Sequence, residues 1–411
     1  VVDGVSWRVL LEDLQQICVA LAAGQAANLP PRSTSLKAWA EALHGYAASA
    51  ALEQELGWWQ AQLQGVDDSL PCDNPEGARQ NRNVLSVSTR LDADTTRQLL
   101  QEAPAAYRTQ INDLLLTALA QVISRWTGRR DVLIRLEGHG REDLFDDLDL
   151  SRTVGWFSSL FPVRLTPQAD LPGSIMAIKE QLRAVPNKGI GYGVLRYLGS
   201  EAARAALAGL AEGAIVFNYL GQFDGSFNDK DALFAPSGES SGAGQSDSAP
   251  LPALLGINGQ VYGGELSLSW SFSAEVFDSA TVQRLADEYS QALRELIAHC
   301  TRDDVAGVTP SDFPLARLTQ DQLQRLPVPA ADIQDVYPLS PMQEGLLLHT
   351  LREPGSGIYL MQYCYLIEHA IDLAAFESAW RTVVERHEVL RTSFCWDVAE
   401  QMVQILSLIH I

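Results

Sequence analysis

Hydrophobic residues recur at helical spacing in several stretches of the chain. Between residues 109 and 127 the apolar positions fall at steps of three and four, and Gly128 follows them. This stretch therefore predicts a helix that buries one face and ends at the glycine. The same spacing predicts further helices over residues 5–23, 35–64, 173–185, 278–299 and 373–388.

Alternating apolar and polar residues predict the strands. Residues 266–273 alternate most regularly, with Leu, Leu, Trp and Phe on one side and four serines on the other. Asn258-Gly259 lies between two extended runs and predicts a hairpin turn. The strand expected at 131–136 follows the helix over 109–127 and brings Glu137 to its end. Further strands are expected within 83–91, 153–165 and 214–220.

Turn-rich stretches divide these elements. Residues 67–77 indicate a connection between lobes, and the Gly/Ser/Asp-rich residues 224–250 predict a mobile surface loop. Residues 316–334 are interpreted as a linker. A new pattern starts beyond them, where Ser340, Pro341 and Gln343 have the spacing of a helix N-cap, first-turn proline and capping-box partner. The order of elements predicts the α/β fold class without repeats.

Composition excludes several classes of function. The formal net charge is −21 over 411 residues, and no basic stripe appears that could bind nucleic acid. No apolar run is long enough to cross a membrane, and no signal segment is visible. The five cysteines are far apart, so they predict reduced, mostly buried thiols in a cytoplasmic protein and no metal site. Nor do the seven histidines form an H-x-x-x-H pair.

Both ends of the chain look cut. The first residues, "VVDGVSW", contain no methionine and read as the end of a strand. The last six, "LSLIHI" at 406–411, match the translation of a common sequencing adaptor, although an apolar strand is the alternative. We therefore expect a truncated fold whose natural sequence ends near residue 405.

The stretch "LEGHGRE" at 136–142 carries candidate acid–base chemistry. Glycines beside Glu137 and His139 let the backbone bend and a substrate approach closely. Burial of a carboxylate at a strand end disfavours its charged form, which suits proton transfer. The alternative is that Glu137 pairs with Arg135 or Arg141 and only holds a turn. The glycine-rich "GIGYG" at 189–193 follows a helix and a proline, which argues against a dinucleotide loop.

Five motifs in order resemble the epimerization domains of nonribosomal peptide synthetases. They read "VVDGVSWRVLLEDL", "EGHGRE", "RTVGWFSSLFPVRL", "PNKGIGYG" and "FNYLGQF". Further along, "YPLSPMQEGLLLHTL" and "RHEVLRTSF" are similar to the first two motifs of a condensation domain. The form "LSPMQEGLL" resembles the subclass that joins a D-configured donor to an L-configured acceptor.

The resemblance implies a chloramphenicol-acetyltransferase-like fold of two lobes with a channel between them. Residues 1–66 would end the first lobe of the epimerization domain, and 80–315 would form its second lobe. The linker 316–334 would lead to the start of a condensation domain at 335–405.

The implied reaction is L-to-D epimerisation of an aminoacyl or peptidyl thioester by transfer of its α-proton. The substrate would arrive on the 4'-phosphopantetheine arm of a neighbouring carrier domain, with no cofactor bound directly. Carrier domains would be the partners, with no nucleic acid or membrane. Glu137 would exchange the proton opposite a histidine expected just upstream of Val1, so this fragment itself is expected to be inactive.

The resemblance also assigns roles to other residues. Tyr219 would assist the enolate or return the proton, Asn218 would line the site, and His139 is a candidate substrate contact that also fits a satisfied loop residue. Structural roles are implied for the motif residues Asp3, Gly4, His387 and Arg391. Two alternatives stay open, namely a non-catalytic carrier-docking platform of the same fold and a domain that forms peptide bonds.

Overall fold

The computed structural model describes residues 2–222, 233–234, 239, 242–355, 357–398 and 401–408. The chain divides into two compact units, which are described separately. The first unit contains Val1–Pro104 and Thr109–Thr301, and the second contains Ala105–Arg108 and Arg302–Ile411. The first unit thus contains residues 1–66 and most of residues 80–315, the ranges expected for the two lobes.

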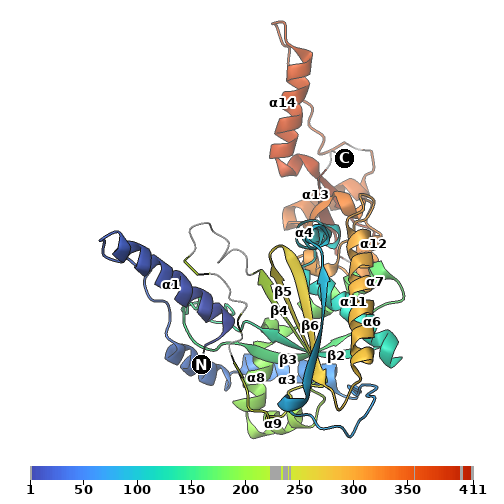
Figure 1. Ribbon diagram of the computed structural model, residues 1–411. Helices are drawn as coiled ribbons and strands as arrows, with labels where there is room; N and C mark the ends of the chain where they lie inside the picture. The colour runs from blue at the N-terminus through green and yellow to red at the C-terminus, as the bar shows by residue number, and fades with distance from the viewer. Residues whose placement is uncertain are drawn as a thin grey trace. The chain divides into compact units, whose positions relative to one another are not determined.

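A six-stranded sheet forms the centre of the first unit, with strand order β1-β6-β5-β4-β2-β3 (Figure 1). The neighbours β2, β4 and β5 run parallel, and the remaining pairs are antiparallel. The parallel pairs bring the carboxyl ends of β2 and β4 to one edge of the sheet. The strands are β1 Val84–Leu91, β2 Val132–Gly138, β3 Ser159–Leu165, β4 Ile215–Gln222, β5 Leu255–Tyr262 and β6 Glu265–Ser273.

The long helices α6 (Ile111–Thr127) and α11 (Ser279–Cys300) lie side by side and form most of the core with the sheet (Figure 1). As predicted, α6 ends at Gly128, which adopts a left-handed conformation with φ of 66°. The alternation predicted for 266–273 is also confirmed, because the apolar members of β6 are buried. Among them, Trp270 packs edge-on against Tyr289 of α11 with ring centroids 5.7 Å apart.

Three of the remaining helices of the first unit, over residues 93–101, 190–197 and 201–208, were not predicted, and three predicted features differ from the structure. The stretch 35–64 divides into two helices, because Ser49 caps a new N-terminus. Residues 153–158 do not join β3. The predicted apolar stripe of α1 is largely exposed, with Trp7 55% accessible. These helices are α1 Gly4–Ala22, α2 Leu36–Tyr46, α3 Ala50–Leu63, α4 Ala93–Gln101, α7 Leu171–Arg183, α8 Ile190–Tyr197 and α9 Glu201–Ala208, with the short 3-10 segments η1 Asn81–Asn83 and η2 Pro186–Gly189.

The hairpin prediction at Asn258-Gly259 is wrong. Both residues lie inside β5, and the chain turns instead at Gly263 and Gly264, which have φ values of 63° and 79°. A two-residue hairpin turn needs positive φ at its central residues, and two glycines supply it without a steric penalty. Most of the loop expected over 224–250 lies outside the described residues.

The second unit contains a three-stranded sheet of order β7-β9-β8. Its strands are β7 Ile333–Pro338, β8 Thr392–Cys395 and β9 Val403–Ser407. Residues 316–334, which were interpreted as a linker, are packed in the structure. Leu318, Leu323 and Leu326 are buried in one core with Val336 of β7. The short helices here are α5 Ala103–Tyr107, which crosses from the first unit, α12 Gln320–Gln324, η3 Pro310–Asp312 and η4 Ala330–Asp332.

Two longer helices, α13 (Pro341–Arg352) and α14 (Leu373–Arg386), follow in the second unit, with η5 (Glu388–Arg391) after α14. The capping box predicted for α13 is confirmed, because Gln343 N donates to Ser340 Oγ and Ser340 N donates to the Gln343 side chain. Apolar side chains of α14 remain accessible, including Trp380 at 53%. β9 contains Leu406 and Ser407, and residues 409–411 lie outside the described part of the chain.

All five cysteines are unpaired, as expected. The expectation of mostly buried thiols is wrong, since only Cys300 and Cys395 are buried, while Cys18 and Cys364 are exposed. Burial raises the pKa of the Cys300 thiol to about 12, so this thiol stays protonated and acts as a packing group. Within the described ranges, no helix has the length and apolar character needed to cross a membrane.

Candidate functional site

Glu137, near the carboxyl end of β2, meets Asn218, in the middle of the parallel strand β4. The pairing of Leu136 with Phe217 between β2 and β4 places the next residue of each strand on the same face of the sheet. There the Asn218 amide donates to Glu137 Oε2 at 3.3 Å. Both residues are half-buried, so the strand end that was expected to be buried is partly accessible.

The arginines near Glu137 have other partners. Arg135 pairs with Glu212 at 3.6 Å and also contacts the Pro252 carbonyl oxygen. Arg141 pairs with Asp3 at 2.6 Å. Across the described residues Glu137 makes no ion pair, so the alternative in which it only closes a turn with Arg135 or Arg141 is not found.

Asp3 and Arg141 form a buried ion pair that joins α1 to the segment after β2. Their side chains are only 5% and 7% exposed. Asp3 caps α1 by accepting from Ser6 N, and it also accepts from Phe157 N. Burial alone would raise the pKa of Asp3, but these hydrogen bonds and those from Arg141 outweigh it and lower the pKa to about 2.

The Arg141 guanidinium has further contacts that fix its plane. It donates to the Thr153 carbonyl and the Ser6 hydroxyl, and it stacks 4.2 Å from the centre of the Phe157 ring. Gly4 is the first residue of α1, directly after the capping Asp3. Asp3 and Gly4 therefore form the start of α1, and the buried guanidinium of Arg141 holds this helix start in place.

The polar turn after Glu137 depends on one glycine. Gly140 has φ of 66°, and a Cβ atom there would lie 1.7 Å from the Phe157 carbonyl oxygen. His139 accepts at Nδ1 from Arg141 N, and its Nε2 lies 3.4 Å from Glu142. Glu142 also pairs with Lys188 at 2.9 Å. The His139 side chain is 53% exposed and has both ring nitrogens engaged.

Tyr219 lies on the opposite face of β4 from Asn218. Successive side chains of a strand alternate between faces, and the Tyr219 ring is next to Gly259 and close to Leu268, on the apolar side. Its hydroxyl is buried and has no hydrogen-bond partner among the described residues. Burial raises the pKa of Tyr219 to about 12. The structure thus brings Glu137 and Asn218 together and separates Tyr219 from them.

A row of polar residues continues from Glu137 across the sheet. Cross-strand pairing aligns Asn218 with Asn258, Asn258 with Ser269, and Ser269 with Ser88. Asn258 and Ser88 are exposed and Ser269 is half-buried. The row therefore presents amide and hydroxyl groups on the same face as the Glu137 carboxylate.

His387 and Arg391 lie in the second unit. Arg391 is buried, and its guanidinium donates to the Val384 carbonyl at 3.2 Å and to the Gln334 side chain at 3.0 Å, with a further contact to the Ser407 carbonyl. His387 caps the C-terminus of α14 and is exposed. Arg391 thus joins the end of α14 to two strands of the small sheet.

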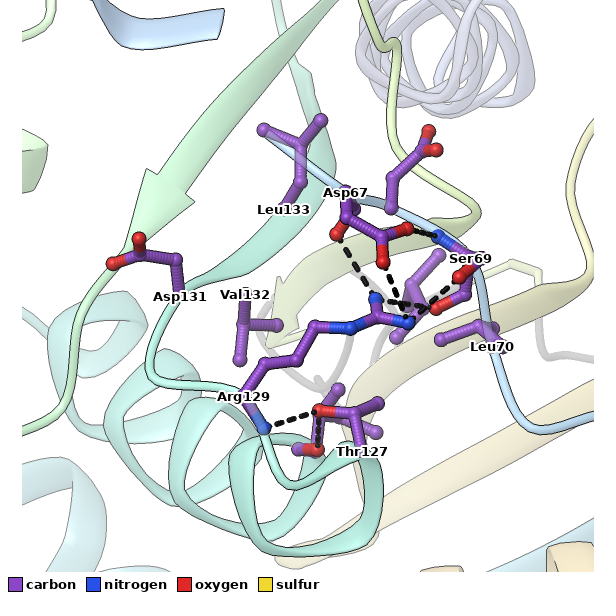
Figure 2. A pocket seen from close by; sticks show the side chains of 11 residues that line it. Asp67, Ser69, Leu70, Thr127, Arg129, Asp131, Val132 and Leu133 are labelled. Carbon is purple, nitrogen blue, oxygen red and sulfur yellow. Dashed lines mark hydrogen bonds and ion pairs between the residues drawn. The ribbon is translucent and has the colours of Figure 1, made fainter. Parts of the chain in front are cut away.

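Arg129 is one of the residues that line a separate cavity of the first unit (Figure 2). The guanidinium of Arg129 donates to the Asp67 and Ser69 carbonyls at 3.0 and 2.7 Å and pairs with the Asp67 carboxylate at 3.1 Å. These contacts hold the predicted connection at 67–77 against the start of β2. Within the described ranges, no cluster of His, Cys, Asp and Glu side chains has metal-binding geometry.

Comparison with known proteins defines the class. The family model "Condensation domain" matches residues 1–319 and 333–409. The chain therefore belongs to the condensation-domain family. It is 47% identical over 402 residues to one of the subunits of linear gramicidin synthase of Brevibacillus parabrevis, a match that covers 97% of this chain and 5% of that protein. Bacitracin synthase 3 of Bacillus licheniformis is 37% identical over 410 residues, covering 98% of this chain and 6% of the relative.

Solved structures show the same fold. The epimerization domain from the third module of tyrocidine synthetase B matches with a TM-score of 0.68 and 38% identity, covering 73% of this chain and 67% of that one. The X-domain from teicoplanin biosynthesis matches with a TM-score of 0.54 and 21% identity, covering 74% and 69%. The α/β fold of the condensation and epimerization domains expected from the sequence is thereby confirmed.

Two charged residues at or beside the turn Pro186–Gly189 were not predicted from the sequence. Glu55 on α3 is a buried carboxylate, and Lys188 reaches Glu142 from the turn before α8. The only available signal was the motif "PNKGIGYG", which contains Lys188, whereas nothing in the amphipathic pattern of 35–64 marked Glu55 as buried.

Proposed function

We propose that the first unit is part of an epimerization domain of a nonribosomal peptide synthetase. The substrate is an aminoacyl or peptidyl thioester carried on the phosphopantetheine arm of a neighbouring carrier domain. Support comes from the 38% identity to a solved epimerization domain over most of the chain. The parent enzyme, its carrier partners and its substrate are part of this proposal, because the chain spans only 5% of the length of the gramicidin synthase relative.

The observation that carries the proposal is the accessible Glu137 carboxylate beside the Asn218 amide. Epimerisation breaks the Cα–H bond on one face and forms a new one on the other, so it needs a base and an acid on opposite sides. In one direction the Glu137 carboxylate takes the α-proton and becomes a carboxylic acid, and the electron pair moves into the thioester enolate. The histidine that the resemblance implies upstream of Val1 then returns a proton from the other face.

Asn218 orients the proposed base in this scheme. Its amide donates to Glu137 Oε2 and so orients the carboxylate, while the other oxygen makes no ion pair within the described chain. The polar row through Asn258 and Ser269 supplies groups that can hydrogen-bond the amides of a carrier-bound chain. Donation of a hydrogen bond or proton from the Tyr219 hydroxyl to the enolate stays a prediction. The Tyr219 ring lies on the face of β4 opposite Asn218, so its position does not support this role.

The test uses the parent polypeptide that contains this domain, loaded with its carrier-bound substrate. Glu137→Gln keeps the shape and the hydrogen bond from Asn218 but cannot accept a proton. We expect incorporation of solvent deuterium at the α-carbon to fall roughly 100-fold, as for other lost acid–base groups. Glu102→Gln, at an exposed surface pair, is the matched control and should exchange normally.

The outcomes separate the candidate functions. Normal deuterium incorporation in Glu137→Gln would contradict the assignment of the base. Absence of incorporation in the unaltered protein, with no peptide formed, would indicate a carrier-docking platform. Peptide formation without incorporation would indicate a domain that forms peptide bonds.

We further propose that residues 335–405 begin a condensation domain that joins a D-configured donor to an L-configured acceptor. Supporting observations are the separate family match over 333–409 and the compact unit that includes these residues. The intact downstream domain should condense a carrier-bound D-aminoacyl donor faster than its L form. Equal rates for the two donors would contradict the subclass and leave the family membership intact.

A further inference from the structure

The turn Pro186–Gly189 contains two consecutive residues in an unusual backbone conformation. Asn187 and Lys188 have φ values of 43° and 51°, a left-handed region that residues other than glycine rarely adopt. Such conformations persist where surrounding contacts hold them. Here the two side chains are held by contacts to different parts of the first unit.

Asn187 is held by a buried carboxylate. Its amide donates to Glu55 Oε1 at 2.8 Å and contacts the Tyr46 hydroxyl at 3.2 Å. Tyr46 also donates to Glu55 at 2.9 Å, and Trp59 Nε1 lies 3.4 Å from the second carboxylate oxygen. Glu55 is only 7% exposed, and these neutral donors satisfy it without any cation among the described residues. Burial first, and then the hydrogen bond to Glu55, raise the pKa of Tyr46 to about 12, so its hydroxyl stays a donor.

Lys188 reaches the polar turn after Glu137. Its ammonium pairs with Glu142, whose side chain is 10% exposed and also contacts His139. The Lys188 side chain is 77% exposed, so the pair adds little stability by itself and acts mainly through geometry. The next residue, Gly189, lies directly against the Phe161 ring, where a Cβ atom would be 2.3 Å from the ring carbons. Phe161 pairs with Leu136 in the strand that carries Glu137.

We propose that the turn Pro186–Gly189 is a latch that positions Glu137. It connects the buried Glu55 of α3 to the segment 139–142 and to β3, the strand next to β2. Asn187 and Lys188 are positioning residues, because each acts through other residues and neither is placed at the reacting carbon. The inference rests on the proposed function, since it names what holds the proposed base in register with the substrate.

The test compares three variants of the natural polypeptide that carries this chain. Asn187→Gly removes the side-chain amide. Glycine adopts positive φ freely, so the substitution does not strain the turn. We expect α-proton exchange at saturating substrate to fall roughly tenfold, because small displacements of a reacting group are costly. We expect KM for the carrier-bound substrate to change much less, and backbone amide hydrogen exchange at residues 138–142 to rise.

Lys188→Met should cause the same changes with a smaller amplitude, and it provides the test if Asn187→Gly does not fold. The matched control is Lys37→Met, which removes a lysine from an exposed pair with Glu41 on α2. Wild-type amide exchange at 138–142 in Asn187→Gly and Lys188→Met would overturn the latch. Raised amide exchange with unchanged α-proton exchange would overturn the positioning role.

The experiments distinguish a failure of the proposed function from a failure of the latch. If Glu137→Gln exchanges the α-proton normally, the proposed base is wrong whatever the latch variants do. The amide exchange of 138–142 still reports whether the turn holds that segment, because this readout does not depend on any reaction.

Discussion

Two carboxylates of the first unit, Asp3 and Glu137, have opposite surroundings. Asp3 is buried and accepts hydrogen bonds from two backbone amides and the Arg141 guanidinium. Glu137 is half-buried and accepts one hydrogen bond of 3.3 Å from Asn218. A carboxylate whose oxygens are all occupied is fixed in its charged form, whereas one with a free oxygen can exchange protons with a substrate. This difference supports a structural role for Asp3 and leaves the Glu137 carboxylate available for the proposed proton transfer, although Asp3 contacts the motif to which Glu137 belongs.

The largest effect is expected from Arg141→Met, which leaves the Asp3 charge buried without its cation. Removing one partner of a buried pair typically costs about 3 kcal/mol or more of folding free energy. We expect that loss in the local free energy of unfolding, measured by native-state amide hydrogen exchange along α1. Arg284→Met, whose pair with Glu288 is exposed, should cost less than about 1 kcal/mol. An equally small cost for Arg141→Met would remove the contrast between the two carboxylates.

Acid titration of the unaltered protein measures how much the ionised Asp3 carboxylate contributes to folding stability. The folded-state pKa of Asp3 is about 2, below its ordinary value of 3.8. The ionised carboxylate therefore stabilises the fold above pH 3.8, and this contribution is lost as the pH falls through 2. The contribution is about 2 kcal/mol. Asp3→Asn should flatten the loss of stability between about pH 4 and pH 2, and an unchanged slope would show that other carboxylates dominate this range.

The fold followed from the sequence more completely than the site did. Long amphipathic helices and the alternation of 266–273 were readable because a repeated pattern of burial involves many positions. The turn at Gly263-Gly264 was missed because Asn258-Gly259 has the same local chemistry, and only strand pairing decides between them. Local patterns cannot distinguish two turn signals that lie so close together in the chain.

Within the site, the motif resemblance singled out Glu137 and Asn218 without showing that they touch. Their contact depends on the parallel pairing of β2 with β4, which are far apart in the chain and cannot be paired from either strand alone. The partner of Arg141 was likewise open, because Asp3 lies 138 positions away. The side of β4 on which Tyr219 lies follows from alternation once Asn218 is placed.

A smaller effect on stability is expected for Glu137→Gln. Because Glu137 makes no ion pair in the described chain and its amide partner can also donate to glutamine, Glu137→Gln should leave the unfolding free energy within about 0.5 kcal/mol. Amide hydrogen exchange along β2 and β4 measures this value. A loss comparable to that of Arg141→Met would mean that Glu137 is a structural carboxylate like Asp3, and the fall in α-proton exchange would then have a structural explanation.

Tyr219→Phe is expected to have the smallest effect of the four changes. The hydroxyl is buried without a partner among the described residues, so its removal breaks no hydrogen bond and should leave stability unchanged or raise it slightly. Because the ring lies on the apolar face of β4, opposite Asn218, the hydroxyl does not share the surface on which Glu137 would meet the substrate. We therefore expect solvent deuterium incorporation at the α-carbon to fall by less than roughly tenfold, well short of a lost acid–base group. A fall as large as that of Glu137→Gln, with stability retained, would show that the end of β4 turns Tyr219 toward the enolate and would restore its predicted role as the proton donor.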